Sequence, residues 1–136
     1  SGNQEVLNRL RKGSTVKQNL KAMKLTKAVG IQLKVGIIVG SPGETWQSVE
    51  DTKKLLKECP PDFWNVSVFT PYPGSDAWAF PEKYRLKILT RDLAEYSMVG
   101  KDWKGNVVVE TEKMTKSDIE QARDELINLL TDISPQ

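Results

Sequence analysis

The fold is decided by the stretch KVGIIVGSPGET, which runs from Lys34 to Thr45. It begins with a continuous apolar run over residues 35–39, which predicts a strand covered on both faces, as in a parallel α/β sheet. The small and rigid residues at 40–43 then require a tight turn, and Thr45 is a suitable N-cap for a following helix. This turn is therefore expected where parallel sheets and barrels place their ligand sites, at the carboxyl end of a strand.

Composition limits the classes of protein that the chain can represent. Its 136 residues suffice for one domain but not for a complete eight-stranded barrel, which takes about 250 residues. Charged residues make up 28% of the chain and hydrophobic residues 38%, as in a folded globular protein. The net charge of +2 comes without a basic stripe, so we expect no nucleic-acid partner. No apolar run approaches the ~20 residues of a membrane span and no signal peptide opens the chain, so we expect no membrane partner.

Cysteine and histidine usage narrows the chemistry. The chain has one cysteine, Cys59, and no histidine. A single cysteine excludes an internal disulfide and is compatible with the cytoplasmic location that we expect. It also cannot provide the several thiolates that hold an iron–sulfur cluster. Because the commonest general base and zinc ligand is absent as well, we expect no catalytic set and no metal site within this chain.

The neighbouring segments supply the elements of a βα repeat. Helical spacing of apolar residues predicts an amphipathic helix over 15–29, and a second helix follows the central turn over 45–58. Aromatic and β-branched residues predict a second strand over 64–69, which ends in the rigid turn TPYPG at 70–74. The order helix, strand, helix, strand predicts that this strand pairs in parallel with 34–39, with both following turns at the same edge.

The repeat stops after the second turn. The apolar residues of 76–93 show no clean period, and 98–104 is predicted to be a loop. The pattern NVVVET predicts a short strand over 107–111, which would add a third strand to the sheet. A last amphipathic helix is predicted over 115–132.

The residues alone leave two interpretations of the polar edge open. Glu44 is the one ionisable group fixed at the first turn. It either bonds a ribose hydroxyl or an ammonium group of a ligand, or stabilises the helix start while Gly40 and Gly43 make the turn. Tyr72, in the second turn, either lies over a ligand or plugs the end of the sheet. Both interpretations predict a polar edge that two loops build on an α/β sheet.

Three segments together resemble a known family. Residues 36–45, GIIVGSPGET, are similar to the fifth-strand motif of radical S-adenosylmethionine (SAM) enzymes, which contacts the adenine of the cofactor. Residues 1–7, SGNQEVL, resemble the segment after the fourth strand of that family, and residues 69–75, FTPYPGS, resemble the end of its sixth strand. The spacing fits, with one helical unit between each pair of segments. The tail resembles, more weakly, the extension found in the subgroup that carries an N-terminal cobalamin-binding domain.

The resemblance implies a partial TIM-like (β/α) barrel fragment. Residues 1–75 would belong to the carboxyl-terminal half of the barrel, and residues 76–136 would form an extension that packs on it within one compact domain. The parent enzyme would use SAM and a [4Fe–4S] cluster whose ligands are not in this chain, together with cobalamin if it belongs to that subgroup, and would act on a small-molecule substrate. The residues that carry over to cofactor binding are Asn3, Gly40, Pro42, Gly43, Glu44, Thr70 and Tyr72.

The same comparison predicts how such a piece should behave. Its partner would be the missing amino-terminal half of the same domain, and the piece alone should be inactive and bind SAM weakly or not at all. An uncovered strand edge and apolar face should promote self-association, unless the tail covers them with Trp78, Phe80 and Trp103. Two alternatives remain: a non-catalytic nucleotide- or phosphate-binding α/β module, and a docking wall of a larger barrel.

Overall fold

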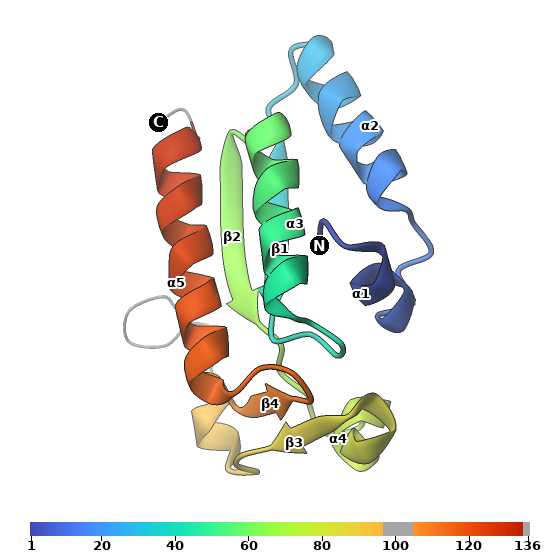
Figure 1. Cartoon of the computed structure of the whole chain (residues 1–136), viewed down its shortest axis with the longest axis vertical. Coiled ribbons are helices and arrows are strands. Elements are labelled where there is room, and N and C mark those ends of the chain that lie inside the picture. Colours follow the sequence, from blue (N-terminus) through green and yellow to red (C-terminus); the bar gives the residue numbers. More distant parts are fainter. Residues whose placement is uncertain (97–104, 135–136) are drawn as a thin grey trace.

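The computed structural model describes residues 1–96 and 105–134 of the chain. Helices and short strands alternate along it (Figure 1). The first part of the chain contains α1 (Gln4–Arg9), α2 (Val16–Ala28), β1 (Lys34–Val39), α3 (Trp46–Glu58) and β2 (Phe63–Val68). The second part contains α4 (Asp76–Ala79), η1 (Pro81–Tyr84), β3 (Leu86–Ile88), η2 (Leu93–Glu95), β4 (Val109–Thr111) and α5 (Lys116–Ile133).

Strands β1 and β2 pair in parallel, as the order of predicted elements requires. Lys34 lies opposite Phe63 and Val39 opposite Val68, so both strands end at the same level. The two turns that follow them therefore meet at one edge of the sheet, which confirms the α/β class and the position of the polar edge. Within the described residues this sheet has two strands, and the partial barrel stays a prediction.

Local capping explains why the three long helices begin where they do. Thr15, Thr45 and Thr115 each accept a hydrogen bond from a backbone N–H of the first helical turn. In each case the residue three positions later returns a bond to the backbone of the cap, which completes a capping box. These patterns lie within four residues of sequence, and this is why the helices were predictable.

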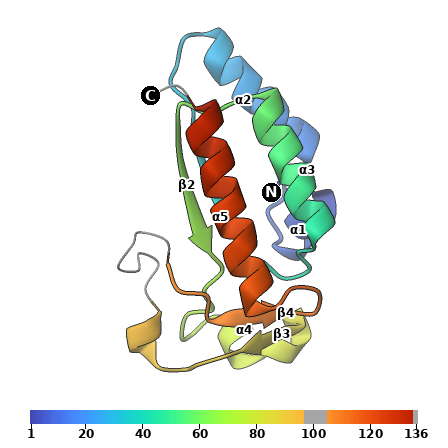
Figure 2. The same cartoon turned by 60° about the vertical axis from the view of Figure 1, so that its left-hand side comes forward.

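The main core lies on one face of the β1–β2 sheet. Helices α3 and α5 lie side by side over that face (Figures 1 and 2). They bury the strand residues Val39 and Val68 against Leu56 and Leu126. Helix α2 packs on α3 through a separate small cluster, in which Met23 of α2 lies with Leu55 of α3.

The opposite face of the sheet is open, and the prediction of a strand covered on both faces is wrong for the described residues. The burial of β1 alternates, with Ile37 and Val39 buried but Gly36 exposed. Ile38, on the open face, is 37% exposed. An apolar run is typical of two-sided burial, but it cannot say which neighbours cover each side. Here both covering helices lie on the same side.

The predicted cover from the tail is also not formed by the described aromatic residues. Phe80 is itself 53% exposed, and Trp78 packs with Tyr96 rather than over the open face. Trp103, the third residue named for this cover, lies outside the described residues, as does the loop predicted over 98–104.

The prediction of a third strand in the main sheet is wrong. The strand expected over 107–111 is β4, which is shorter and begins at Val109. It pairs antiparallel with β3 in a second, two-stranded sheet. Strand β3 has three residues, too few to show a period in sequence. It lies within the segment 76–93, where no element was predicted. No helix in the described ranges is long and apolar enough to cross a membrane.

Candidate functional site

The first turn after β1 is built on two glycines in left-handed conformation. Gly40 has φ +76° and Gly43 has φ +80°, values that a side chain would disfavour. The N–H of Glu44 donates to the carbonyl of Ser41 at 3.0 Å, which closes the turn. Pro42 is buried at its tip. The chain thus reverses between β1 and the N-cap of α3 within five residues.

Glu44 points into this turn instead of out toward a ligand. Its side chain is only 3% exposed, and its carboxylate accepts hydrogen bonds from the N–H groups of Gly40 and Ser41. Burial raises the pKa of Glu44 from its ordinary 4.5 to about 7, against the opposing effect of the two backbone hydrogen bonds. The structure therefore gives Glu44 a role in holding the turn, and the amides that an outside anion would need are already occupied.

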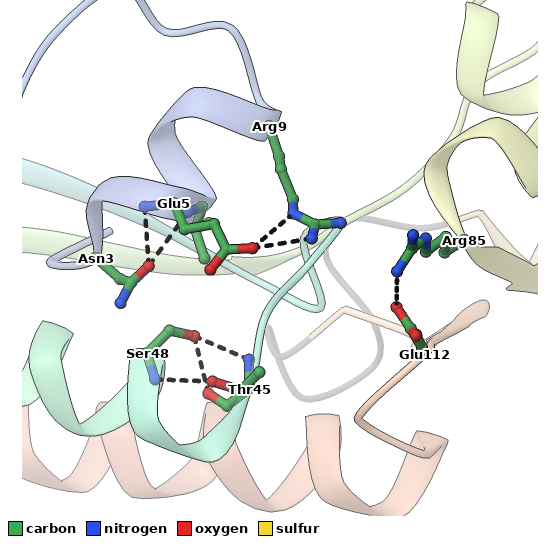
Figure 3. Close-up of polar contacts among 8 residues, drawn as sticks. Asn3, Glu5, Arg9, Thr45, Ser48, Arg85 and Glu112 are labelled. Atoms are coloured by element: carbon green, nitrogen blue, oxygen red, sulfur yellow. Dashed lines mark hydrogen bonds and ion pairs between the residues drawn. The ribbon is translucent and has the colours of Figure 1, made fainter.

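Helix α1 covers the same turn from outside. The Arg9 side chain lies where a Cβ at Gly43 would be, so this glycine is required for close approach. Arg9 is held by Glu5 at 2.9 Å on the same helix (Figure 3). A second ion pair, Arg85–Glu112 at 2.8 Å, joins the end of η1 to the loop after β4. A ligand at this edge therefore meets α1 before it reaches Gly43.

Asn3 is the N-cap residue of α1. Its side-chain oxygen accepts from the N–H groups of Glu5 at 3.1 Å and Val6 at 3.2 Å (Figure 3). Its amide nitrogen donates to Asp51 on α3 at 2.9 Å, which lowers the pKa of that carboxyl. Asn3 thus fastens α1 to α3, which accounts for this residue without a ligand.

The second turn, after β2, presents an aromatic ring. Tyr72 is 43% exposed, and its ring lies 6.3 Å from that of Tyr96 at a tilt of 60°. Tyr96 also makes an edge contact with Trp78 at 5.4 Å, and its hydroxyl donates to the carbonyl of Thr90 at 2.7 Å. The tail therefore supports one side of the Tyr72 ring. Thr70 turns its hydroxyl back to the carbonyl of Val68 at 3.2 Å.

A hollow of about 400 Å³ lies on the open face of the sheet and runs to this second turn. None of the described residues that line it is charged. The side chains or backbone that form its floor and rim include Gly36, Ile38, Asn65, Ser67, Thr70 and Tyr72.

The hollow brings together two of the predicted site residues, Thr70 and Tyr72, with the strand residues Gly36 and Ile38. It does not include the other five: Asn3, Gly40, Pro42, Gly43 and Glu44. Whether any of the seven contacts a cofactor stays a prediction.

Sequence reasoning missed Asn65 and Ser67. The signal for them was present in FWNVSV, where polar residues alternate with buried valines and so share the open face of β2.

The described residues hold no group of histidine, cysteine and carboxylate side chains that could bind a metal ion. Cys59 is buried at the end of α3 beside Met23 and Leu55, away from the hollow. The residues present therefore do not fit an iron–sulfur cluster.

Comparison with known proteins gives several relatives, although no family model matches. The chain is 31% identical over 99 residues to an uncharacterized methyltransferase of Pyrococcus horikoshii. The aligned residues make up 73% of this chain and 21% of that protein. It is 32% identical over 93 residues to the anaerobic magnesium-protoporphyrin IX monomethyl ester cyclase of Rubrivivax gelatinosus, covering 68% and 16%. It is 32% identical over 84 residues to the tRNA-2-methylthio-N(6)-dimethylallyladenosine synthase of Chromobacterium violaceum, covering 60% and 19%.

The structure defines an α/β protein with a parallel strand pair and a hollow on its open face, which the described residues line without a charge. The relatives are members of one superfamily, and the chain belongs to it: the radical SAM superfamily. The chain spans about a fifth of the length of these curated relatives.

Proposed function

We propose that this chain forms part of the SAM-binding wall of a radical SAM enzyme. The observation that carries the proposal is the hollow on the open sheet face, next to the carboxyl ends of β1 and β2. Ligand sites of parallel α/β sheets and barrels lie at this end of the strands. The membership in the superfamily supports SAM as the cofactor of the parent enzyme.

The lining of the hollow suits the adenosyl part of the cofactor. Ile38 offers an apolar surface against which a flat ring can lie. Tyr72 and Thr70 stand at the rim, where an aromatic face and a hydroxyl would meet the ring edge and the sugar. Each residue contributes to binding and orientation; none carries a proton-transfer role.

The turn residues act on the site indirectly in this proposal. Gly40, Gly43 and the buried Glu44 fix the end of β1, and Pro42 and Asn3 fix the turn and α1 around it. Direct contact between these five residues and SAM remains a prediction. A structural role is supported for Gly40 and Glu44 by the hydrogen bond between them, and for Asn3 by its bonds to α1 and α3.

The parent enzyme would supply what this chain lacks. In this superfamily, reductive cleavage of SAM beside a [4Fe–4S] cluster supplies the radical that starts the chemistry. Since no described residues fit the cluster, its ligands would come from the remaining part of the protein. We propose that this part extends a TIM-like barrel from the free edge of β1. Use of cobalamin and the identity of the small-molecule substrate remain predictions.

Assay of the isolated chain separates this proposal from a self-sufficient nucleotide-binding module. After anaerobic reconstitution with iron, sulfide and reductant, we expect no 5′-deoxyadenosine from SAM and no saturable SAM binding by calorimetry. A module would instead bind nucleotides at about micromolar Kd, which is worth about 8 kcal/mol. The relatives do not favour the module. Formation of 5′-deoxyadenosine by this chain alone would contradict the proposal.

A further inference from the structure

Two polar side chains stand in the middle of β2 on its open face. Asn65 lies opposite Gly36, and Ser67 lies opposite Ile38, in the parallel register. Both line the hollow, while the alternate residues Val66 and Val68 are buried on the other face. They thus line the hollow from β2, where Asn65 is exposed and Ser67 is half-buried.

These residues are poor choices for the stability of a strand. Asn and Gly are both depleted in strands, yet Asn65 and Gly36 are paired directly. A Cβ at Gly36 would lie 3.3 Å from the side-chain oxygen of Asn65, so the amide lies across this glycine. A local conflict of this kind, without a gain in packing, is expected at functional sites.

The pair also has unused hydrogen-bonding capacity. The amide nitrogen of Asn65 donates to the hydroxyl of Ser67 at 3.2 Å. Within the part of the chain that the structure describes, the Asn65 carbonyl oxygen has no hydrogen-bond partner, and the Ser67 hydroxyl donates to none. An acceptor and a donor are therefore free side by side, which is the complement of an amide group.

Charge decides between an amide and the anions of similar shape. A carboxylate or phosphate that enters the hollow would lose hydration and meet no cation from the described residues, since none of those that line it is a lysine or arginine. An uncharged amide keeps two hydrogen bonds, one with Asn65 and one with Ser67. The hollow therefore disfavours anionic ligands, because its described lining residues include no cation.

We propose that Asn65 and Ser67 are specificity-determining residues that select an uncharged, amide-like edge of a ring-shaped substrate. This inference rests on the proposed function, because it assigns the substrate-facing floor of the same hollow. It adds the chemical class of the substrate group: a neutral heteroaromatic or lactam edge with adjacent donor and acceptor.

The test uses two probes that share one ring, nicotinamide and nicotinate. Backbone amide shifts of the chain are followed by NMR at a protein concentration where sedimentation shows a monomer. Nicotinamide should shift Ile38, Asn65 and Ser67 with a millimolar Kd, and nicotinate should bind at least about fivefold more weakly, since one lost charged or polar contact is worth about 1 kcal/mol.

Variants separate recognition from strand stability. Asn65→Val should abolish the preference for nicotinamide yet raise the unfolding midpoint by about 2–4 °C, because a β-branched residue replaces a poor strand former. Ser67→Val should lose the preference as well. Asn128→Val, at an exposed position on α5, should leave the preference unchanged.

Three results would overturn the inference: equal affinity for both probes, no shift with either, or a preference that survives in Asn65→Val. Backbone amide shifts of the hollow residues that change with protein concentration but not with nicotinamide would assign the open face to a second copy of the chain. That result would also overturn the inference. None of these experiments uses SAM. Failure of SAM binding in the parent enzyme would therefore refute the proposed function, whereas the preference for nicotinamide over nicotinate is measured independently of it.

Discussion

Glu44 shows how one buried carboxyl group can control a turn. Its protonated form is favoured in the folded chain, because burial raises its pKa from 4.5 to about 7. Between these two values the folded state binds more protons than the unfolded state, so the free energy of unfolding falls as the pH rises. The folded chain should therefore be most stable in mild acid and less stable above neutrality.

We predict that the free energy of unfolding drops by about 2–3 kcal/mol between pH 5 and pH 8, because burial raises the pKa of Glu44 to about 7. Urea denaturation at both pH values measures it. Glu44→Gln should remove most of this drop, since its side chain does not ionise. Glu82→Gln, at an exposed position in η1, should leave it in place. A wild-type chain with no loss of stability over this range would contradict the assignment.

The sequence identified Glu44 as the ionisable group of the turn but could not choose between a ligand contact and a structural role. The choice depends on burial, and burial here results from tertiary packing around the turn, with Arg9 of α1 lying against Gly43 and Ile119 of α5 close to Gly40. No local pattern carries that information. Asn65 was overlooked for the related reason that its face is open only because both covering helices lie on the other side.

At the scale of elements, local signals account for the successes. Capping boxes and helical periods predicted α2, α3 and α5 nearly to the residue, and the turn chemistry predicted where β1 and β2 end. The pairing of β4 with β3 was not predictable, because it depends on a three-residue partner with no period of its own. The formation of a short strand depends more on packing against neighbouring strands than on its own sequence.

Helix α5 should contribute much of the stability, because it covers the sheet face that α3 only partly covers. Leu126, on α5, is fully buried against the sheet. Leu126→Ala should lower the free energy of unfolding by about 3 kcal/mol, through lost transfer energy and the cavity left behind. Leu25→Ala on α2, where the leucine is 56% exposed, should cost less than about 0.5 kcal/mol. Equal costs in urea denaturation would show that α5 is not part of the core.

At the scale of the whole molecule, the described residues are arranged asymmetrically: two helices cover one face of the β1–β2 sheet, and none of these residues forms a layer over the other face. The open face carries Ile38, and within the described ranges β1 pairs only with β2. Exposed strand edges and apolar faces favour association between chains.

We therefore predict that the isolated chain self-associates through this face. Sedimentation velocity over a concentration series should show a reversible increase in mass. Ile38→Lys should weaken the association by placing a charge on the open face, whereas Leu25→Lys on the outer side of α2 should not. A clean monomer at all concentrations, with slow amide exchange in β1, would mean that this face is protected in another way.

The most direct test of the central claim is the SAM dependence of the parent enzyme when Ile38 is changed. The protein would be expressed from its complete reading frame, reconstituted anaerobically, and assayed for 5′-deoxyadenosine. Ile38→Asp should raise the KM for SAM about tenfold or more, because a carboxylate replaces the apolar floor of the hollow. Ile31→Asp, at a position 60% exposed and outside the hollow, should change it less than about twofold. Equal KM values for the two variants would contradict the account that the open face of this sheet is the cofactor wall.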